Sequence, residues 1–492
     1  MDISTSPDAS KTPAATVWDL DGTLLATDTF VETLAAYLFR QPWRAPRILF
    51  WLLRGRAHCK GRLAAAIDLD VFQWPIRADV ETLIKEAKNK GRPVVLATAA
   101  HRLVADSVAA RLGYFDAVLA SDGDINLKGR RKREAIREWM ASAGHDTFSY
   151  AGDSSADLPI WADADEVIVV QPTAALRKRV ERLGKPVFVI GKTTSLMDGL
   201  LAACRPYQWS KNALLFVPML LAQKFDLTTI GHVVVAFIAF SACASAIYLW
   251  NDIGDLQFDR THPKKSSRPF ASGAVPISWG AACCVFLLIG AGLLGAFVLP
   301  PAFLLVAIMY LIANIGYTIW LKQLPIVDVM MLACMYALRL EAGAAAADVP
   351  LSSWTLTFAL FFFMSLALAK RHAELRRISC EAGSKALGRG YVVDDIGLIE
   401  QAGISSGCVS VLVMALYMNS NQMRLLWGDG RLLWPICPLT LYWVTRLWLL
   451  ARRGQLDEDP ILFALRDRVS LGIFATISLF ICIAIAYMGI AR

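Results

Sequence analysis

The chain has 492 residues, of which 56% are hydrophobic, and a net charge of +8. Its mean hydropathy of +0.45 excludes a wholly soluble protein. The positive charge alone would suit a nucleic-acid partner, but Lys and Arg fall mostly between apolar runs, which is the membrane pattern, so we expect no nucleic-acid binding. The ten cysteines include no CxxC pair and many lie in apolar runs, which argues against a disulfide framework or a zinc site.

Apolar residues are distributed unevenly along the chain, which predicts more than one domain. Residues 1–13 are polar and lack the apolar core of a signal peptide, so we expect a disordered N-terminus followed by a cytoplasmic domain. Residues 14–200 alternate charged and apolar segments, as soluble α/β domains do. From about residue 209 long apolar runs dominate, and we expect an all-α polytopic membrane domain over residues 201–492.

Strand-like runs in the first domain end at polar residues. One run covers Ala15–Trp18, and later runs end at Thr98, Ser121 and Asp153, with helical segments between them. This alternation predicts a parallel sheet with helices on both faces. Ligands of such sheets bind at the carboxyl ends of the strands, which is where these polar residues lie.

Four short motifs follow one another in this domain. They are DLDGT from Asp19, Thr98 at a strand end, a lysine in LKGRRKREAI, and GDSSAD from Gly152. In this order they resemble the motifs of the haloacid dehalogenase superfamily of phosphohydrolases. The resemblance implies a multidomain chain that begins with a Rossmann-like α/β phosphatase domain, with a helical cap at about residues 28–80.

The same resemblance implies a role for each motif residue. Asp19 would be the nucleophile that attacks phosphorus, and Asp21 the general acid that protonates the leaving oxygen. Thr98 and Lys132 would bind the phosphoryl group. A bound Mg²⁺ would shield the repulsion between the nucleophile and the phosphate. The ligands of this Mg²⁺ would be Asp19, Asp153 and Asp157. The alternative is a domain that keeps the fold but not the catalysis.

Within the expected cap, the segment from Trp43 to Arg56 is apolar with basic flanks. Two interpretations are open. The segment packs between the cap and the core of the domain, or it lies against a membrane surface.

The second domain contains nine apolar runs that suit membrane-spanning helices. They cover residues 212–228, 231–250, 277–298, 301–320, 325–346, 352–369, 401–418, 432–450 and 469–490. The loops on the side of the first domain hold fifteen Lys and Arg, whereas the opposite loops hold three. This bias predicts a multi-pass protein of the cell inner (cytoplasmic) membrane, with the first domain and the active sites in the cytoplasm.

A polar segment, Asn251–Gly273, lies between two apolar runs and reads NDIGDLQFDRTHPKKSSRPFASG. Spacings of three and four put Asp252, Asp255 and Asp259 on one side of a helix. Carboxylates together with the Asn251 amide oxygen suit Mg²⁺, which also binds phosphate oxygens. A cluster of basic residues follows directly, as a diphosphate requires. These residues are Arg260, His262, Lys264, Lys265 and Arg268. A solvated charged loop is the alternative.

The pattern NDxxDxxxD resembles the first aspartate-rich motif of the UbiA superfamily of intramembrane prenyltransferases, which typically have nine membrane helices. The longer string with DRTHPKKSSRP resembles one branch of it, the decaprenyl-phosphate phosphoribosyltransferases. That resemblance implies transfer of a phosphoribosyl group from phosphoribosyl diphosphate to a polyprenyl phosphate, with Mg²⁺ as the cofactor of both domains.

Other polar residues lie at the ends of the apolar runs or inside them, where a charge is costly unless it is paired or lines a wet cavity. Arg339 and Glu341 fall inside one run, and we expect either a structural ion pair between them or a site for substrate. The substrate-binding candidates are Lys211, Asn212, Tyr317, Lys322, Arg339, Lys370 and Arg371. Asp328 is a further candidate metal ligand, and Glu374, Asp459 and Asp467 are additional contributors.

Typical UbiA enzymes carry a second motif, DxxxD, but here Leu332 stands four residues after Asp328. The segment Asn251–Gly273 contains more basic residues than binding of a single diphosphate would require, which indicates a substrate with further anionic groups. The fused phosphatase would fit the 5-phosphate that transfer leaves on a lipid-linked ribose. We therefore expect a bifunctional enzyme with phosphoribosyl diphosphate, polyprenyl phosphate and membrane lipids as partners, and allow for a homo-oligomer. The alternatives are a prenyltransferase with an unrelated phosphatase, and a non-enzymatic transporter or scaffold.

Overall fold

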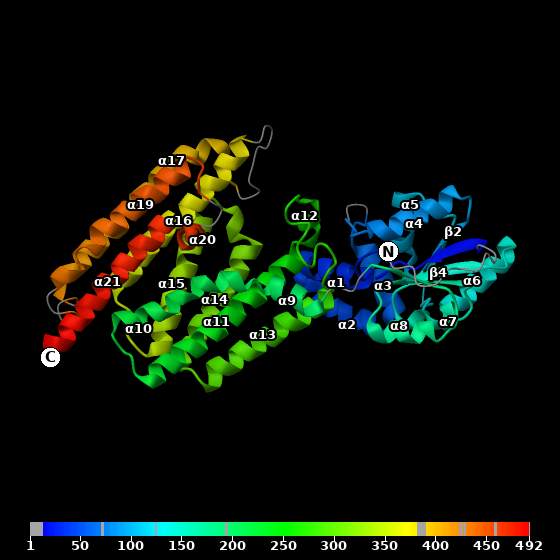
Figure 1. The fold of residues 1–492 in the computed structure, drawn as a ribbon, viewed down its shortest axis with the longest axis horizontal. Coiled ribbons are helices and arrows are strands. Elements are labelled where there is room, and N and C mark those ends of the chain that lie inside the picture. Colours follow the sequence, from blue (N-terminus) through cyan, green and yellow to red (C-terminus); the bar gives the residue numbers. More distant parts are fainter. Residues whose placement is uncertain are drawn as a thin grey trace. The chain divides into compact units, whose positions relative to one another are not determined.

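The computed structural model describes residues 13–69, 73–123, 125–191, 195–380, 390–421, 423, 427, 430–456 and 460–491 (Figure 1). The expected disorder of residues 1–13 therefore lies almost wholly outside the described residues. The chain divides into two compact units. The first contains Met1–Arg205 and Tyr248–Cys284, and the second contains Pro206–Ile247 and Val285–Arg492.

The first unit is built on a sheet of six parallel strands in the order β3-β2-β1-β4-β5-β6. The strands are β1 (Ala15–Trp18), β2 (Val94–His101), β3 (Ala117–Ser121), β4 (Phe148–Gly152), β5 (Glu166–Val170) and β6 (Val187–Ile190). The expected parallel sheet is confirmed. The central strand β1 pairs in parallel with both β2 and β4, so the carboxyl ends of the three strands lie at one edge.

Both faces of the sheet are covered by helices, as Figure 1 shows. Alternate residues of the central strands enter different cores. Trp18 and Leu96 belong to one core with the cap and α5, whereas Val17 and Val95 belong to the other. This burial on both faces explains the nearly continuous apolar runs in the sequence. The helices of this part are α4 (Ala78–Asn89), α5 (Arg102–Leu112), α6 (Arg130–Ala143), η2 (Ser155–Asp157), α7 (Leu158–Trp161), α8 (Ala174–Glu181) and α9 (Leu196–Cys204).

The helical cap is inserted between β1 and β2, as expected. It contains α1 (Thr29–Arg40), η1 (Pro42–Arg44), α2 (Ala45–Leu53) and α3 (Arg56–Ala66). Asp28 caps α1 by accepting hydrogen bonds from the Phe30 and Val31 N–H groups. The cap is therefore fixed only a few residues after DLDGT.

The polar segment expected at a membrane face belongs to the first unit and packs against the cap. Helix α11 (Leu227–Gly254) ends within it and α12 (Leu256–Thr261) follows. Arg260 of α12 forms a bidentate ion pair with Glu32 of α1, at 2.5 and 2.8 Å, and the Glu32 side chain is 1% exposed. Arg260 also donates to the carbonyl oxygens of Gln73 and Ala271.

Two further contacts join this segment to the cap region. The rings of Phe39 and Trp250 have their centroids 4.5 Å apart. Gly273 has a φ of +76°, and a Cβ there would lie 2.2 Å from the Ala26 carbonyl oxygen, so this close approach requires glycine.

The second unit is helical, and α11 and α13 contribute residues to both units. Its elements are η3 (Pro206–Phe216), α10 (Val217–Leu221), α13 (Ile277–Phe297), α14 (Pro301–Ile319), η4 (Leu321–Gln323), α15 (Val327–Ala347), α16 (Ser353–Cys380), η5 (Val393–Asp395), α17 (Ile396–Met418), η6 (Gly430–Leu433), α19 (Ile436–Arg452), α20 (Pro460–Arg466) and α21 (Arg468–Ala491). Among the described residues, seven helices are long and apolar enough to span a membrane.

Two of the nine expected spans differ from the helices observed. The run at 212–228 is split between η3, α10 and the start of α11, because Gln223 has a φ of +52° and the polar Lys224 and Asp226 follow. The run at 432–450 is helical in α19, but this helix has only 17 residues. In addition, α16 continues to Cys380, so that the segment 370–377 is helical and not a loop.

We predict that Glu32→Gln destabilises the first unit, because it leaves the buried Arg260 guanidinium without its carboxylate. Breaking a buried ion pair on one side costs about 3–5 kcal/mol, which corresponds to a fall of roughly 5–15 °C in the unfolding midpoint. Thermal unfolding of the full chain in detergent would measure it. Glu81→Gln, which removes a partly exposed ion pair with Lys85, is the control and should change the midpoint little. Equal midpoints for the two variants would contradict this role of Glu32.

Candidate functional site

The carboxyl edge of the central strands brings together the motif residues of the first unit. Asp19 directly follows β1, Thr98 lies in β2, and Asp153 directly follows β4. Lys132, in the first turn of α6, reaches the same edge with its Nζ 2.8 Å from Asp19 Oδ2. Four residues far apart in the sequence thus lie at one edge of the sheet.

Three of the carboxylates form a cluster that fits a divalent cation. Asp19, Asp153 and Asp157 each offer an oxygen, and these oxygens lie within 4.8 Å of one another. Hard carboxylate oxygens at this spacing are the ligands that Mg²⁺ prefers. The residues present therefore fit the Mg²⁺ site expected from the sequence.

The acidity of this cluster is altered by its environment. Burial raises the pKa of Asp19 to about 6, although the charge of Lys132 acts to lower it. Burial and the charges of Asp19 and Asp157 raise the pKa of Asp153 to about 8. Burial and the charge of Asp28 raise the pKa of Asp21 to about 7, although the Thr29 N–H donates to Asp21 Oδ1 at 2.9 Å. A carboxyl group with such a pKa is suited to act as both general acid and general base near neutral pH.

Lys132 is the buried cation of the cluster, with its side chain 3% exposed. Its ammonium group donates to the Tyr150 hydroxyl at 3.1 Å, and this hydroxyl donates to Asp157 Oδ1 at 2.9 Å. Burial acts to lower the pKa of Lys132, but the charges of Asp19 and Asp157 together raise it. Lys132 therefore stays protonated and holds Asp19 in place. Tyr150 was not expected from the sequence, because no motif contains it.

The glycine of DLDGT is required by the approach of Asp153. Gly22 has a φ of +75°, and a Cβ on it would lie 2.1 Å from Asp153 Oδ2. Any other residue would both strain the backbone and displace this carboxylate.

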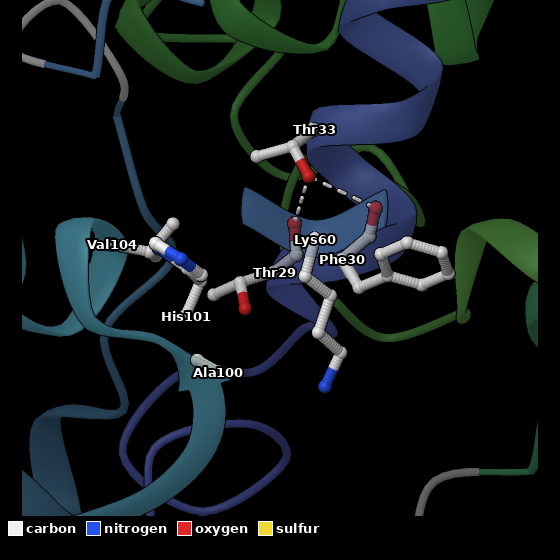
Figure 2. A pocket seen from close by; sticks show the side chains of 7 residues that line it. All are labelled: Thr29, Phe30, Thr33, Lys60, Ala100, His101 and Val104. Carbon is white, nitrogen blue, oxygen red and sulfur yellow. Dashed lines mark hydrogen bonds between the residues drawn. The ribbon is translucent and has the colours of Figure 1, made fainter. Parts of the chain in front are cut away.

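A small, half-open pocket with room for about one water molecule lies between the cap and the core. Figure 2 shows its lining from α1, α3, the end of β2 and the start of α5. Thr29, whose backbone bonds Asp21, is one of the lining residues, so the pocket adjoins the expected general acid. The lining residues are Thr29, Phe30, Thr33, Lys60, Ala100, His101 and Val104.

The polar lining of this pocket includes one cation. Lys60 Nζ donates to the Ala99 carbonyl oxygen at 2.6 Å, and burial lowers its pKa while the charges of Asp21 and Asp28 act to raise it. Sequence reasoning missed Lys60 and His101 as site residues. The sequence indicated them only by position, since Lys60 lies in the expected cap and His101 lies three residues after Thr98. The Thr98 hydroxyl accepts a hydrogen bond from the Ala100 N–H.

The aspartate-rich segment is arranged around Arg268. Its guanidinium lies 3.0 Å from Asp252 and 2.7 Å from Asp259, and Arg205 lies 2.6 Å from Asp252. The helix breaks at Asp255, between α11 and α12, so the three carboxylates are not on one continuous helix. Asp255 has no ion pair within the described residues.

Two observations on this segment fit a bound cation. Asn251 Oδ1 is buried and accepts no hydrogen bond from the described residues, and burial raises the pKa of Asp259 despite the charge of Arg268. An amide oxygen and several carboxylates are a suitable donor set for Mg²⁺. In the basic part, Lys264 and Lys265 are exposed and His262 is partly buried, whereas Arg260 is bound to Glu32.

In the second unit, Asp328 is the centre of a buried polar network. It accepts hydrogen bonds from Arg371 at 2.7 Å and from Tyr391 at 2.8 Å. Arg371 also pairs with Glu374 and donates to Tyr317 at 3.2 Å. The structure therefore brings together four sequence-predicted candidates, Asp328, Arg371, Tyr317 and Glu374, and adds Tyr391. Lys322 lies in η4 and Lys370 in α16.

Arg339 lies in a second polar network of this unit. It donates to Asn212 Oδ1, the Tyr310 hydroxyl and the Met335 carbonyl oxygen. Within the described residues it forms no ion pair with Glu341, so the expected alternative of a structural pair is not seen. Lys211 precedes Asn212 in η3. Asp467 pairs with Arg446, and Asp459 lies outside the described residues.

Comparison with known proteins finds two families along the chain. Residues 16–161 match the haloacid dehalogenase-like hydrolases, and residues 213–466 match the UbiA prenyltransferase family. An uncharacterized protein, y4nM, of Sinorhizobium fredii is 34% identical over 94% of this chain and 89% of its own length.

Two relatives with named functions cover parts of the chain. A decaprenyl-phosphate phosphoribosyltransferase of Mycobacterium tuberculosis is 37% identical over 37% of this chain and 61% of its own length. A probable phosphatase of the same species is 30% identical over 27% of this chain and half of its own length. The apolar helices and these matches identify a multi-pass membrane protein.

We predict that Gly22→Ala raises the Mg²⁺ concentration needed for half-maximal hydrolysis of p-nitrophenyl phosphate at least tenfold, because the new Cβ displaces Asp153. Gly184→Ala is the matched control, since Gly184 has a φ of +66° with nothing within 4 Å of an added Cβ. Both variants strain the backbone, but only the first disturbs the carboxylates. An unchanged Mg²⁺ requirement in Gly22→Ala would show that Asp153 does not bind the metal.

Proposed function

This chain belongs to the UbiA prenyltransferase family and carries a haloacid dehalogenase-like hydrolase domain, and from this premise we propose that it is a bifunctional membrane enzyme. Its membrane domain transfers 5-phosphoribose from phosphoribosyl diphosphate to a polyprenyl phosphate. Its phosphatase domain then removes the 5-phosphate and leaves a lipid-linked ribose for glycoconjugate synthesis. Both sites face the cytoplasm at the inner membrane.

The observation that carries the proposal is the packing of the aspartate-rich segment against the phosphatase cap within one unit. The Arg260–Glu32 pair joins a transferase motif to the helix whose first residue, Thr29, bonds Asp21. A phosphatase that served an unrelated substrate would have no reason to share a buried ion pair with the transferase segment. The match to a decaprenyl-phosphate phosphoribosyltransferase supports the same donor and acceptor.

For the transfer step, Asn251, Asp252, Asp255 and Asp259 would provide oxygen ligands for Mg²⁺. When bound, this cation would neutralise the diphosphate that leaves the anomeric carbon. Lys264 and Lys265 are exposed and free to bind further phosphate oxygens. Arg268 neutralises Asp252 and Asp259 and lies within reach of the same anions.

In the hydrolysis step, Asp19 attacks the phosphorus of the 5-phosphate and forms an aspartyl phosphate. Asp21 protonates the departing ribose 5-oxygen and then, as a base, activates the water that hydrolyses the aspartyl phosphate. Lys132 holds Asp19 and neutralises the phosphoryl oxygens. The pentose lies on the cap side of Asp21, where Thr29 and Lys60 line a small pocket and meet its oxygens. Mg²⁺ at Asp19, Asp153 and Asp157 would shield the two anions when bound.

We predict that Asp255→Asn lowers the rate of phosphoribosyl transfer by at least two orders of magnitude, since Asp255 is the carboxylate of the motif that no described cation neutralises. Consumption of labelled phosphoribosyl diphosphate with polyprenyl phosphate would measure it. Asp146→Asn, at an exposed position, is the control and should leave the rate unchanged. Full transfer in Asp255→Asn would remove the proposed metal site.

We predict that Asp19→Asn consumes both substrates at the wild-type rate but accumulates lipid-linked phosphoribose, because the variant lacks the nucleophile. Wild type should yield lipid-linked ribose and inorganic phosphate. Mass spectrometry of the lipid fraction would distinguish the two products. Identical phosphorylated lipids from both proteins would assign the phosphatase to another substrate. Consumption of a prenyl diphosphate in place of phosphoribosyl diphosphate would favour a conventional prenyltransferase.

A further inference from the structure

Helix α2 of the cap exposes an apolar face that no described residue of the first unit covers. Leu49, Phe50 and Leu53 are 63%, 66% and 77% exposed, and Pro46 is exposed on the same side. These positions are spaced three and four apart, so they form one face of the helix. Trp43, just before the helix, is 72% exposed. A contiguous exposed patch of this kind marks a surface of interaction, in contrast to single exposed apolar residues.

The opposite face of α2 holds it in the cap. Ile48 is buried, and the ring of Trp51 lies 5.4 Å from that of Tyr37 on α1. One apolar face of α2 therefore packs inside the cap, and the other, formed by Leu49, Phe50 and Leu53, is exposed to solvent. The sequence left two interpretations of this segment, packing between cap and core or lying against a membrane. Packing between cap and core explains Ile48 and Trp51 but not the exposed face.

The charges around α2 all have one sign. Residues 33–67 contain no Asp or Glu, and five exposed arginines lie in the helix or beside it. They are Arg40, Arg44, Arg47, Arg54 and Arg56. Within the described residues none of them forms an ion pair with a carboxylate. An apolar face with an exclusively cationic border matches the surface of an anionic phospholipid bilayer, which offers phosphates beside acyl chains.

A contact within the first unit relates this helix to a membrane-spanning element. Phe39, near the end of α1, contacts Trp250 near the end of α11, a candidate membrane span. Trp residues concentrate at the level of the lipid headgroups. Helix α2 begins six residues after Phe39 and is therefore close along the chain to this contact.

We propose that α2 lies in the headgroup region of an anionic phospholipid bilayer. Leu49, Phe50 and Leu53 insert among the acyl chains, and the flanking arginines bind lipid phosphates. This anchor is distinct from the membrane-spanning helices. It would hold the phosphatase cap at the membrane surface, where a lipid-linked substrate lies. The inference goes beyond the proposed reactions and does not depend on which sugar is transferred.

The test uses the full chain with the photoreactive residue p-benzoylphenylalanine in place of Phe50. The protein is reconstituted in vesicles of phosphatidylcholine alone or of phosphatidylcholine and phosphatidylglycerol at 3:1, irradiated, and analysed by mass spectrometry. The matched control carries the same residue in place of Phe188, which is 41% exposed on β6. We expect lipid adducts at position 50, several-fold more in the phosphatidylglycerol vesicles, and few at position 188.

A second variant removes the charges while leaving the apolar face intact. Substituting Arg44, Arg47 and Arg54 by Gln should reduce the lipid adducts at position 50 several-fold, with unchanged hydrolysis of p-nitrophenyl phosphate. Adducts to peptides of this chain or of a second copy would overturn the proposal and assign the face to a protein contact. Equal labelling at positions 50 and 188, or in both vesicle types, would also overturn it. Neither result would bear on the transfer reaction.

Discussion

The first unit depends on the buried ion pair between Arg260 and Glu32. The pair joins two segments 228 residues apart in the chain, and it connects the groups next to both proposed reactions. Arg260 follows Asp259 of the aspartate-rich segment, and Glu32 lies one turn after Thr29, which bonds Asp21. A buried pair of this kind need not stabilise more than an apolar contact would, but it tolerates only one alignment of its partners. The cap and the aspartate-rich segment are therefore held in a fixed register.

A second constraint is the burial of several carboxylates at one edge of the sheet. Asp19, Asp153 and Asp157 lie together, and among the described residues Lys132 is the cation paired with two of them. Burial raises the pKa values of Asp19 and Asp153 and so disfavours their ionisation. Such a cluster is stable in the charged form only with additional positive charge, which a divalent metal would supply. The close approach that Gly22 allows, and the hydrogen bond from Tyr150 to Asp157, arrange the oxygens for this purpose.

The sequence predicts those features that depend on local patterns. The strands, the order of the phosphatase motifs and most of the membrane helices follow from periodicity and spacing over a few residues. The sequence does not show that Arg260 would bind Glu32, because nothing near Arg260 indicates a partner so far along the chain. We expected Arg260 to bind substrate, and that remains a prediction. Likewise, apolar content alone did not show that the run at 212–228 is broken near Gln223, or that one face of α2 stays exposed.

The central claim is that one chain carries out both reactions in order on the same lipid. It is tested most directly with purified wild-type protein, polyprenyl phosphate and phosphoribosyl diphosphate labelled with ³²P at the 5-phosphate. The account predicts that the label enters the lipid fraction first and then leaves it as inorganic phosphate, while the lipid keeps an unlabelled ribose. Label that stays on the lipid, or that is released as phosphate without ever entering the lipid fraction, would contradict the account.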